Sequence, residues 1–286
     1  MNPRIIVHGG AGRHEIDQPQ DILETAADSG YAAMEEGTAV DAVETAVNVL
    51  EDHPAFNAGN GAKYQLDGNP RPEAAIMTGN GDAGAVTDLD GICHAISVAR
   101  AIMEQTHHVM LSGPFATRFA DHCGFDRQDL SSEKAATEWE KMHAMVEDLS
   151  FDETIETLKE YDTGGTVGCV AIDADGSLAA GTSTGGRSPQ LAGRMGDTPM
   201  IGCGTYCNEH AAVSATGIGE AIITMTLARR CVEYREDGMQ PAVATENAIK
   251  ALEEKTDRHA GVIMLDDNGE TGISHNADEM NTVVRE

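Results

Sequence analysis

Residues 162–173 (DTGGTVGCVAID) and 178–183 (LAAGTS) are the stretch of sequence that decides the fold. Both runs are rich in apolar and β-branched residues, and the turn dipeptide Asp175-Gly176 separates them. This pattern predicts a buried β-hairpin whose first strand begins at Thr166. Two glycines, Gly164 and Gly165, stand directly before that strand and permit backbone conformations that other residues avoid. Thr166 is therefore expected to open a central strand beside flexible backbone.

The rest of the chain alternates between hairpins and pairs of helices. Short apolar runs bounded by turn residues predict further strands at 4–8, 74–77, 85–88, 92–98, 211–215, 261–265 and 271–274. Apolar residues at helical spacing predict helices at 21–35, 39–50, 110–120, 219–235 and 242–255. The charged segment 121–165 is expected to be helical and exposed. This order predicts an α+β fold, with antiparallel sheet covered by helices on both sides in four layers.

Length and charge limit the class of protein. The 286 residues carry 19 basic and 48 acidic side chains, a formal net charge of −29. Such a charge argues against binding to nucleic acid or to an anionic membrane surface, and no apolar run reaches the length of a membrane span. With no repeat or linker, we expect one domain over 1–286 in the cytoplasm. The dense carboxylates favour a salt-adapted surface over an ordinary acidic one.

Two motifs suggest other sites, but their context argues against them. Residues 79–84 (GNGDAG) match a glycine-rich nucleotide-binding pattern, yet a strand and not a helix is expected to follow. Cys203, Cys207 and His210 have metal-ligand spacing but lack a fourth ligand, so buried thiols are favoured over a zinc site. The Gly-x-Ser-x-Gly motif of serine hydrolases is absent.

Thr166 is the remaining candidate for chemistry. A threonine hydroxyl is a weak nucleophile, but it becomes reactive when cleavage of the preceding peptide bond frees its own α-amine to act as the base. From residue types alone, a β-branched residue that opens a strand is still the favoured interpretation.

The surrounding motifs change that balance, because the sequence resembles the plant-type asparaginase and isoaspartyl peptidase family of N-terminal nucleophile hydrolases. The resemblance rests on six motifs in family order and spacing: 8–12 (HGGAG), 56–59 (FNAG), 165–168 (GTVG), 182–186 (TSTGG), 194–197 (RMGD) and 215–220 (ATGIGE). It is weakest across 121–161 and after Asn276. The connection from Asp197 to Thr216 is slightly short for the family.

The resemblance implies a four-layer αββα sandwich that cuts itself between Gly165 and Thr166 into chains of 1–165 and 166–286. Thr166 would be nucleophile and, through its new amine, general base. The remaining implied site residues fall into three groups. Thr184 would hold the nucleophile, and Thr216 and Gly217 would donate hydrogen bonds to the oxyanion. The residues that would bind the substrate's amino-acid head group or line the site are Arg194, Asp197, Gly219, Gly10 and Asn57. Asn57 would also take part in self-cleavage.

No organic cofactor is implied. The resemblance does imply a structural monovalent cation, usually sodium, held by backbone carbonyls of Leu50, Glu51, His53, Phe56, Ala58 and Asn60. It also implies a homodimer of cleaved units and a small-molecule substrate. The expected reaction is hydrolysis of L-asparagine to L-aspartate and ammonia, together with hydrolysis of β-aspartyl dipeptides. The alternatives are a glycosylasparaginase or a threonine aspartase of the same fold, or an uncleaved protein that only binds an amino acid.

Overall fold

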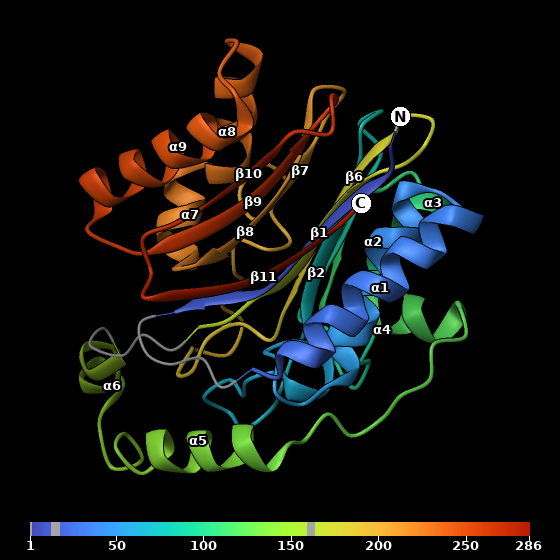
Figure 1. The fold of residues 1–286 in the computed structure, drawn as a ribbon. Coiled ribbons are helices and arrows are strands. Elements are labelled where there is room, and N and C mark those ends of the chain that lie inside the picture. The colour runs from blue at the N-terminus through green and yellow to red at the C-terminus, as the bar shows by residue number, and fades with distance from the viewer. Residues whose placement is uncertain (1, 13–17, 159–163) are drawn as a thin grey trace.

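Two β-sheets packed face to face lie between two layers of helices (Figure 1). The structure is a computed structural model, and it describes residues 2–12, 18–158 and 164–286. The four-layer α+β sandwich predicted from the sequence is confirmed. In the described part of the chain, no helix is both long enough and apolar enough to cross a membrane.

The hairpin predicted for residues 166–183 occupies the centre of the larger sheet. This sheet has seven strands in the order β11 (Glu279–Arg285), β1 (Arg4–Gly12), β5 (Val167–Ile172), β6 (Leu178–Thr184), β2 (Glu73–Thr78), β3 (Ala83–Thr87) and β4 (Met110–Ser112). All neighbours are antiparallel except β3 and β4. The smaller sheet is antiparallel, in the order β10 (Thr271–His275), β9 (Ala260–Asp266), β8 (Ala211–Gly217) and β7 (Thr205–Cys207).

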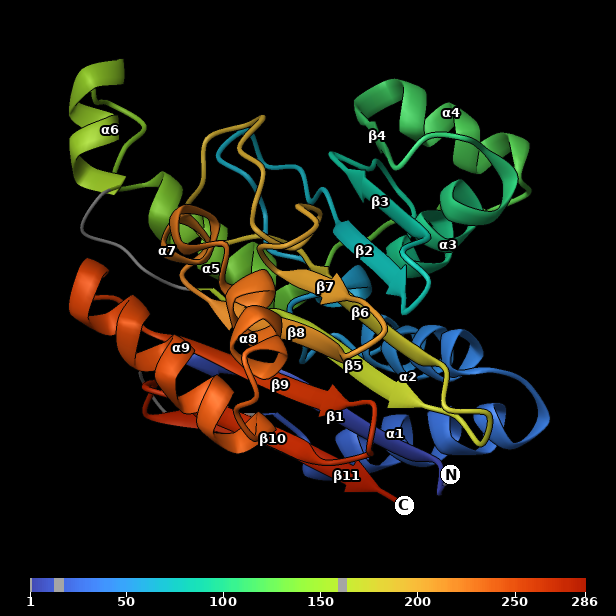
Figure 2. The same ribbon diagram turned by 90° about the horizontal axis from the view of Figure 1, so that it is seen from above.

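Each sheet is covered on its outer face by helices (Figure 2). Helices α1 (Gln20–Glu36), α2 (Ala39–Asp52), α3 (Ala95–Gln105) and α4 (Gly113–His122) cover the larger sheet, and α7 (Gly219–Met225), α8 (Leu227–Glu236) and α9 (Pro241–Thr256) cover the smaller. The predicted stripe of α2 is buried, and a Thr38–Asp41 capping box begins this helix. The acidic segment forms α5 (Glu133–His143) and α6 (Phe151–Leu158) outside the sandwich. The short η1 turn (Gly59–Gly61) follows α2 along the chain.

Several predicted elements are wrong or incomplete. Residues 92–98 do not form a strand, because α3 begins at Ala95 and buries Ile96, Val98 and Ile102 against the larger sheet. A short apolar run fits a buried strand and a buried helix equally well, and packing decided between them. The helix predicted at 110–120 begins with strand β4, and the helix at 219–235 is interrupted at Thr226, whose φ is 46°. Strands β7 and β11 were not predicted.

The space between the two sheets is filled by a core that is separate from the two cores between each sheet and its helices. At one end it is filled by apolar side chains of β1, β5, β6 and β8, including Ile6, Val170, Ala180 and Ala212. At the other end the same strands turn polar. Thr166 lies at this polar end, where β5 begins.

Candidate active site

Thr166 is buried, with 5% of its surface exposed, and its hydroxyl contacts a second threonine. Its Oγ1 donates a hydrogen bond to Thr184 Oγ1 at 3.3 Å. The pairing of Val167 with Ser183 sets this contact, because it brings the start of β5 opposite the end of β6. The predicted partnership between Thr166 and Thr184 is thus present in the geometry.

The peptide carbonyl before Thr166 is held by two donors. Gly165 O accepts from Thr184 Oγ1 at 2.8 Å and from Asn57 Nδ2 at 2.6 Å. Asn57 is itself fixed, since its Oδ1 accepts from Lys63 N–H at 3.0 Å and its Nδ2 also donates to Gly186 O at 2.6 Å. Two donors on one carbonyl oxygen polarise that carbonyl and stabilise negative charge on it.

The smaller sheet and β1 bring the predicted oxyanion residues to the same end. Thr216 is fully buried on β8, and its Oγ1 accepts from Ala11 N–H at 3.2 Å. Gly217 follows with a φ of +127°, and Gly10 on β1 has a φ of +128°. A Cβ on Gly10 would lie 3.3 Å from Thr166 O, so glycine there allows the loop to approach the backbone of Thr166.

The predicted head-group residues also converge. A Cβ on Gly219 would lie 2.6 Å from an Arg194 guanidinium nitrogen and 2.8 Å from Asp197 Oδ1, so this glycine lies between the two charged groups. Burial raises the pKa of Asp197 to about 7. Arg194 Nε donates to Glu220 Oε1 at 3.0 Å, and Arg187 pairs with the same carboxylate at 3.1 Å. A guanidinium beside a buried carboxyl suits an amino acid's carboxylate and ammonium.

Glu73, which the sequence analysis missed, fixes the loop that carries Arg194 and Asp197. Its Oε2 accepts from Gly196 N–H at 2.8 Å, and its Oε1 accepts from Thr87 Oγ1 at 2.7 Å. Burial also raises the pKa of Glu73. The signal in the sequence was a carboxylate at the first position of a buried strand, where a charged residue is unusual without a partner.

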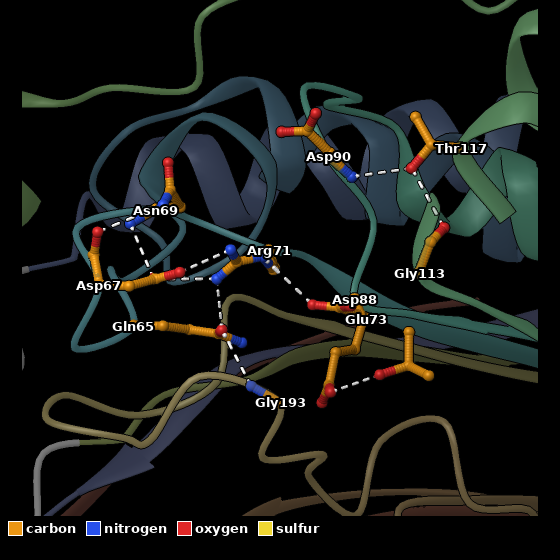
Figure 3. A network of polar contacts seen from close by, with 11 residues as sticks. Gln65, Asp67, Asn69, Arg71, Glu73, Asp88, Asp90, Gly113, Thr117 and Gly193 are labelled. Carbon is orange, nitrogen blue, oxygen red and sulfur yellow. Dashed lines mark hydrogen bonds and ion pairs between the residues drawn. The ribbon is translucent and has the colours of Figure 1, made fainter. Parts of the chain in front are cut away.

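A polar network next to Glu73 supports the same loop (Figure 3). Arg71 is its centre: the guanidinium donates to Gln65 Oε1 and pairs with Asp67 and Asp88. Gln65 Oε1 also accepts from Gly193 N–H at 3.4 Å, one residue before Arg194. The loop that carries Arg194 and Asp197, called the substrate loop below, is therefore anchored to β2 and to the segment that precedes β2.

Two cavities lie at this end of the molecule. The one that Thr166, Thr184 and Gly217 line holds only about 10 Å³, and Gly164 and Gly165 are also among its lining residues. The other has a volume of about 560 Å³ and is lined by apolar side chains together with arginines. Arg187, Arg194 and Ile218 line both cavities.

The predicted cation loop leads from the end of α2 to η1. Its carbonyls at Leu50, His53, Phe56 and Ala58 each accept one backbone N–H, which leaves each oxygen a second lone pair. Glu51 O accepts from the Cys93 thiol at 3.3 Å, and Asn60 donates its side-chain amide to Asp52 O at 3.1 Å. These oxygens are hard donors of the type that sodium prefers. Sodium binding stays a prediction.

The other metal candidate is not supported. Cys203 and Cys207 are buried free thiols, as expected, and His210 is exposed beside Glu209. Within the described residues, the one cluster of potential ligand atoms is Asp52, Cys93 and His94 instead. The glycine-rich run 79–84 forms the turn between β2 and β3, as predicted, and no helix follows it.

The αββα sandwich, with a buried threonine directly before a central strand, is typical of the class of N-terminal nucleophile hydrolases. Within that class the family model described as Asparaginase matches residues 1–286, and the chain belongs to this family. It is 42% identical over 288 residues to the plant-type L-asparaginase of Pyrococcus furiosus, covering 96% of this chain and 94% of the relative. It is 38% identical over 276 residues to the isoaspartyl peptidase/L-asparaginase of Danio rerio, covering 94% and 87%.

Proposed function

We propose that this chain cuts itself between Gly165 and Thr166 and then hydrolyses L-asparagine and β-aspartyl dipeptides. The observation that carries the proposal is the environment of the Gly165 carbonyl. Asn57 and Thr184 donate to its oxygen, and the Thr166 hydroxyl lies beside it in hydrogen-bond contact with Thr184. Membership in the asparaginase family supports the same amidohydrolase chemistry.

Self-cleavage begins with attack of Thr166 Oγ1 on the carbonyl carbon of Gly165. The developing charge on Gly165 O is stabilised by the Asn57 amide and the Thr184 hydroxyl. Thr184 accepts from Thr166 and donates to Gly165 O, so it links the hydroxyl that loses a proton to the oxygen that gains charge. The C–N bond then breaks as Thr166 N takes up the proton that the hydroxyl lost and becomes an amine, and water hydrolyses the resulting ester to restore the Thr166 hydroxyl and release the Gly165 carboxylate.

Hydrolysis of asparagine uses the same hydroxyl, now with the free amine of Thr166 as general base. Arg194 and Asp197 hold the α-carboxylate and α-ammonium, which places the side-chain carbonyl at Thr166. Thr216 and Gly217 stabilise the oxyanion. Ammonia or an amine leaves with a proton, and water then hydrolyses the aspartyl ester to L-aspartate.

The larger cavity favours substrates that have a leaving group bigger than ammonia. It holds about 560 Å³, far more than an amide nitrogen needs, and it shares two arginines with the catalytic cavity. A β-aspartyl dipeptide carries a free carboxylate on its second residue, which an arginine can pair. We therefore include these dipeptides in the substrate range.

Intact mass spectrometry of the purified chain, with aspartate release from L-asparagine, tests the proposal. The wild type should give fragments of 1–165 and 166–286, and Thr166→Ala should give one uncut chain without activity. A Thr166→Ala chain that still cleaves or still releases ammonia would show that Thr166 is not the nucleophile. An uncut, inactive wild type would favour the amino-acid-binding alternative.

Four further properties belong to this proposal. We infer a homodimer of cleaved units, which light scattering of the mature protein tests. Sodium at the loop of residues 50–60 should raise the melting temperature relative to choline at equal ionic strength.

The six free cysteines support a reducing compartment such as the cytoplasm. The net charge of −29 supports a salt-adapted surface.

A further inference from the structure

A row of buried polar residues lies directly beneath the catalytic residues. Successive side chains on one face of a strand are two residues apart. Moving two residues inward from Thr166 before β5, Thr184 on β6 and Thr216 on β8 gives Gly168, Thr182 and Ser214, and His8 on β1 completes the set as the partner of Gly168, next to a bulge between His8 and Gly10. These four are called the support row below. His8 pairs with Gly168, and Gly168 pairs with Thr182, so three of them lie in register across the larger sheet.

The fourth member enters the row from the opposite sheet. Ser214 lies against Gly168, where a Cβ would come within 2.0 Å of Ser214 Oγ and 2.5 Å of His8 Nε2. Glycine at 168 is thus required by close packing, because any side chain would displace both polar groups. The support row is a point where the two sheets interlock.

The hydrogen bonds of the support row form one chain. His8 Nε2 lies 2.9 Å from Ser214 Oγ, Ser214 Oγ lies 2.7 Å from Thr182 Oγ1, and Thr182 Oγ1 donates to Gly204 O at 3.3 Å. Because the carbonyl oxygen of Gly204 can only accept, Thr182 donates to it, Ser214 donates to Thr182, and the Nε2–H of His8 donates to Ser214. Gly204 N–H in turn donates to Asp197 O at 3.0 Å, which connects the chain to the substrate loop.

We propose that His8, acting through Ser214 and Thr182, is a positioning residue that fixes Thr166, Thr184 and Thr216 in their reactive arrangement. This inference rests on the proposed function. Thr182 and Ser214 each lie two residues from a proposed catalytic residue on the same strand, and His8 pairs with Gly168, which lies two residues from Thr166. A shift of Ser214 moves Thr216, and a shift of Thr182 moves Thr184, because only one residue intervenes.

His8 suits this role because it is a fixed donor and not a proton carrier. All of its surface is buried, and this burial lowers the pKa of His8 to about 3. The ring is therefore neutral throughout the physiological range and keeps one N–H for Ser214. No carboxylate is among its hydrogen-bond partners in the described residues.

Ser214→Ala tests the proposal, with kcat measured per cleaved chain and the cleaved fraction taken from intact mass spectrometry. We expect kcat to fall at least about tenfold because the reacting groups are displaced, while KM, which Arg194 and Asp197 set, changes less than twofold. Ser97→Ala is the matched control. It also removes a buried serine hydroxyl, which Asn48 contacts at 3.1 Å, but it lies on α3 in the outer layer.

A second pair of variants tests His8 itself. His8→Gln keeps an amide N–H at the position of Nε2 and should retain kcat within about threefold, whereas His8→Leu should lose at least as much as Ser214→Ala. Equal kcat and equal loss of melting temperature in Ser214→Ala and Ser97→Ala would overturn the proposal. Wild-type aspartate release in the same assay reports on the proposed function itself, so the two hypotheses fail separately.

Discussion

The two ends of the layer between the sheets differ sharply, although the same four strands form both. At the apolar end, Ile6, Val170, Ala180 and Ala212 fill the space with hydrocarbon. These four residues are the apolar row; two residues along each strand lies the support row, and two further lies the catalytic row of Gly10, Thr166, Thr184 and Thr216. The strands therefore change from apolar packing to hydrogen-bonded positioning to chemistry within five residues.

This gradient separates stability from reactivity. Buried hydrocarbon stabilises the fold without specifying orientation, whereas buried hydroxyls are costly unless each one has a partner. In the support row both hydroxyls and the Nε2 of His8 are bonded to one another or to backbone. The difference predicts that substitutions in the catalytic row mainly change kcat and that substitutions in the apolar row mainly change stability.

The catalytic row should show the largest effect. Thr216→Val removes a hydroxyl that stabilises the oxyanion while keeping the shape of the side chain, so kcat should fall about 100- to 1,000-fold. Self-cleavage should proceed, because Asn57 and Thr184 hold the Gly165 carbonyl. Steady-state kinetics and intact mass spectrometry measure both. Asn57→Ala should give the opposite pattern, an uncut chain, and uncut Thr216→Val would contradict the division of roles.

A pH series should show the next largest effect, since the head-group site contains a buried carboxyl. Asp197 has a pKa of about 7 and must be ionised to hold the substrate's ammonium. Its charge is lost as pH falls through that value, so KM for L-asparagine should rise about tenfold from about pH 8 to about pH 6. Initial rates over a pH series measure this. A KM that stays flat while kcat alone falls would assign the titration to the Thr166 amine.

The apolar row should lose stability and keep its activity. Val170→Thr preserves shape but buries a hydroxyl among hydrocarbon, which costs about 1–3 kcal/mol and lowers the melting temperature by about 3–10 °C. The kcat per cleaved chain should stay within about twofold. Val243→Thr on the exposed face of α9 is the control and should cost less than about 0.5 kcal/mol. A tenfold loss of kcat in Val170→Thr would break the comparison.

Salt should have the smallest effect on kcat, because it acts on the surface and not on either end of the interior. Screening of the net charge of −29 should raise the melting temperature by at least about 5 °C between about 0.1 M and about 2 M KCl. Thermal denaturation at several KCl concentrations measures it. A flat melting temperature would remove the case for salt adaptation.

Much of the site could be predicted because its residues stand in short, contiguous motifs. The structure brings Thr184 to the Thr166 hydroxyl and Asn57 to the Gly165 carbonyl, and Gly219 lies between Arg194 and Asp197, while the catalytic roles of these residues stay predictions. Glu73 was missed because its partners, Gly196 and Thr87, are distant in sequence. The strand predicted at 92–98 was wrong because local pattern does not distinguish a short buried strand from a buried helix.

The sequence by itself determined the hairpin of β5 and β6, the glycines that precede Thr166, and the alternation of polar and apolar residues along each strand. These depend on local conformation and on a period of two, both of which a sequence contains. Only the tertiary structure decided that His8, Thr182 and Ser214 meet, since they belong to three strands of two sheets. Hydrogen bonds between distant segments require the packed sandwich, because packing alone fixes the separation and register of the sheets.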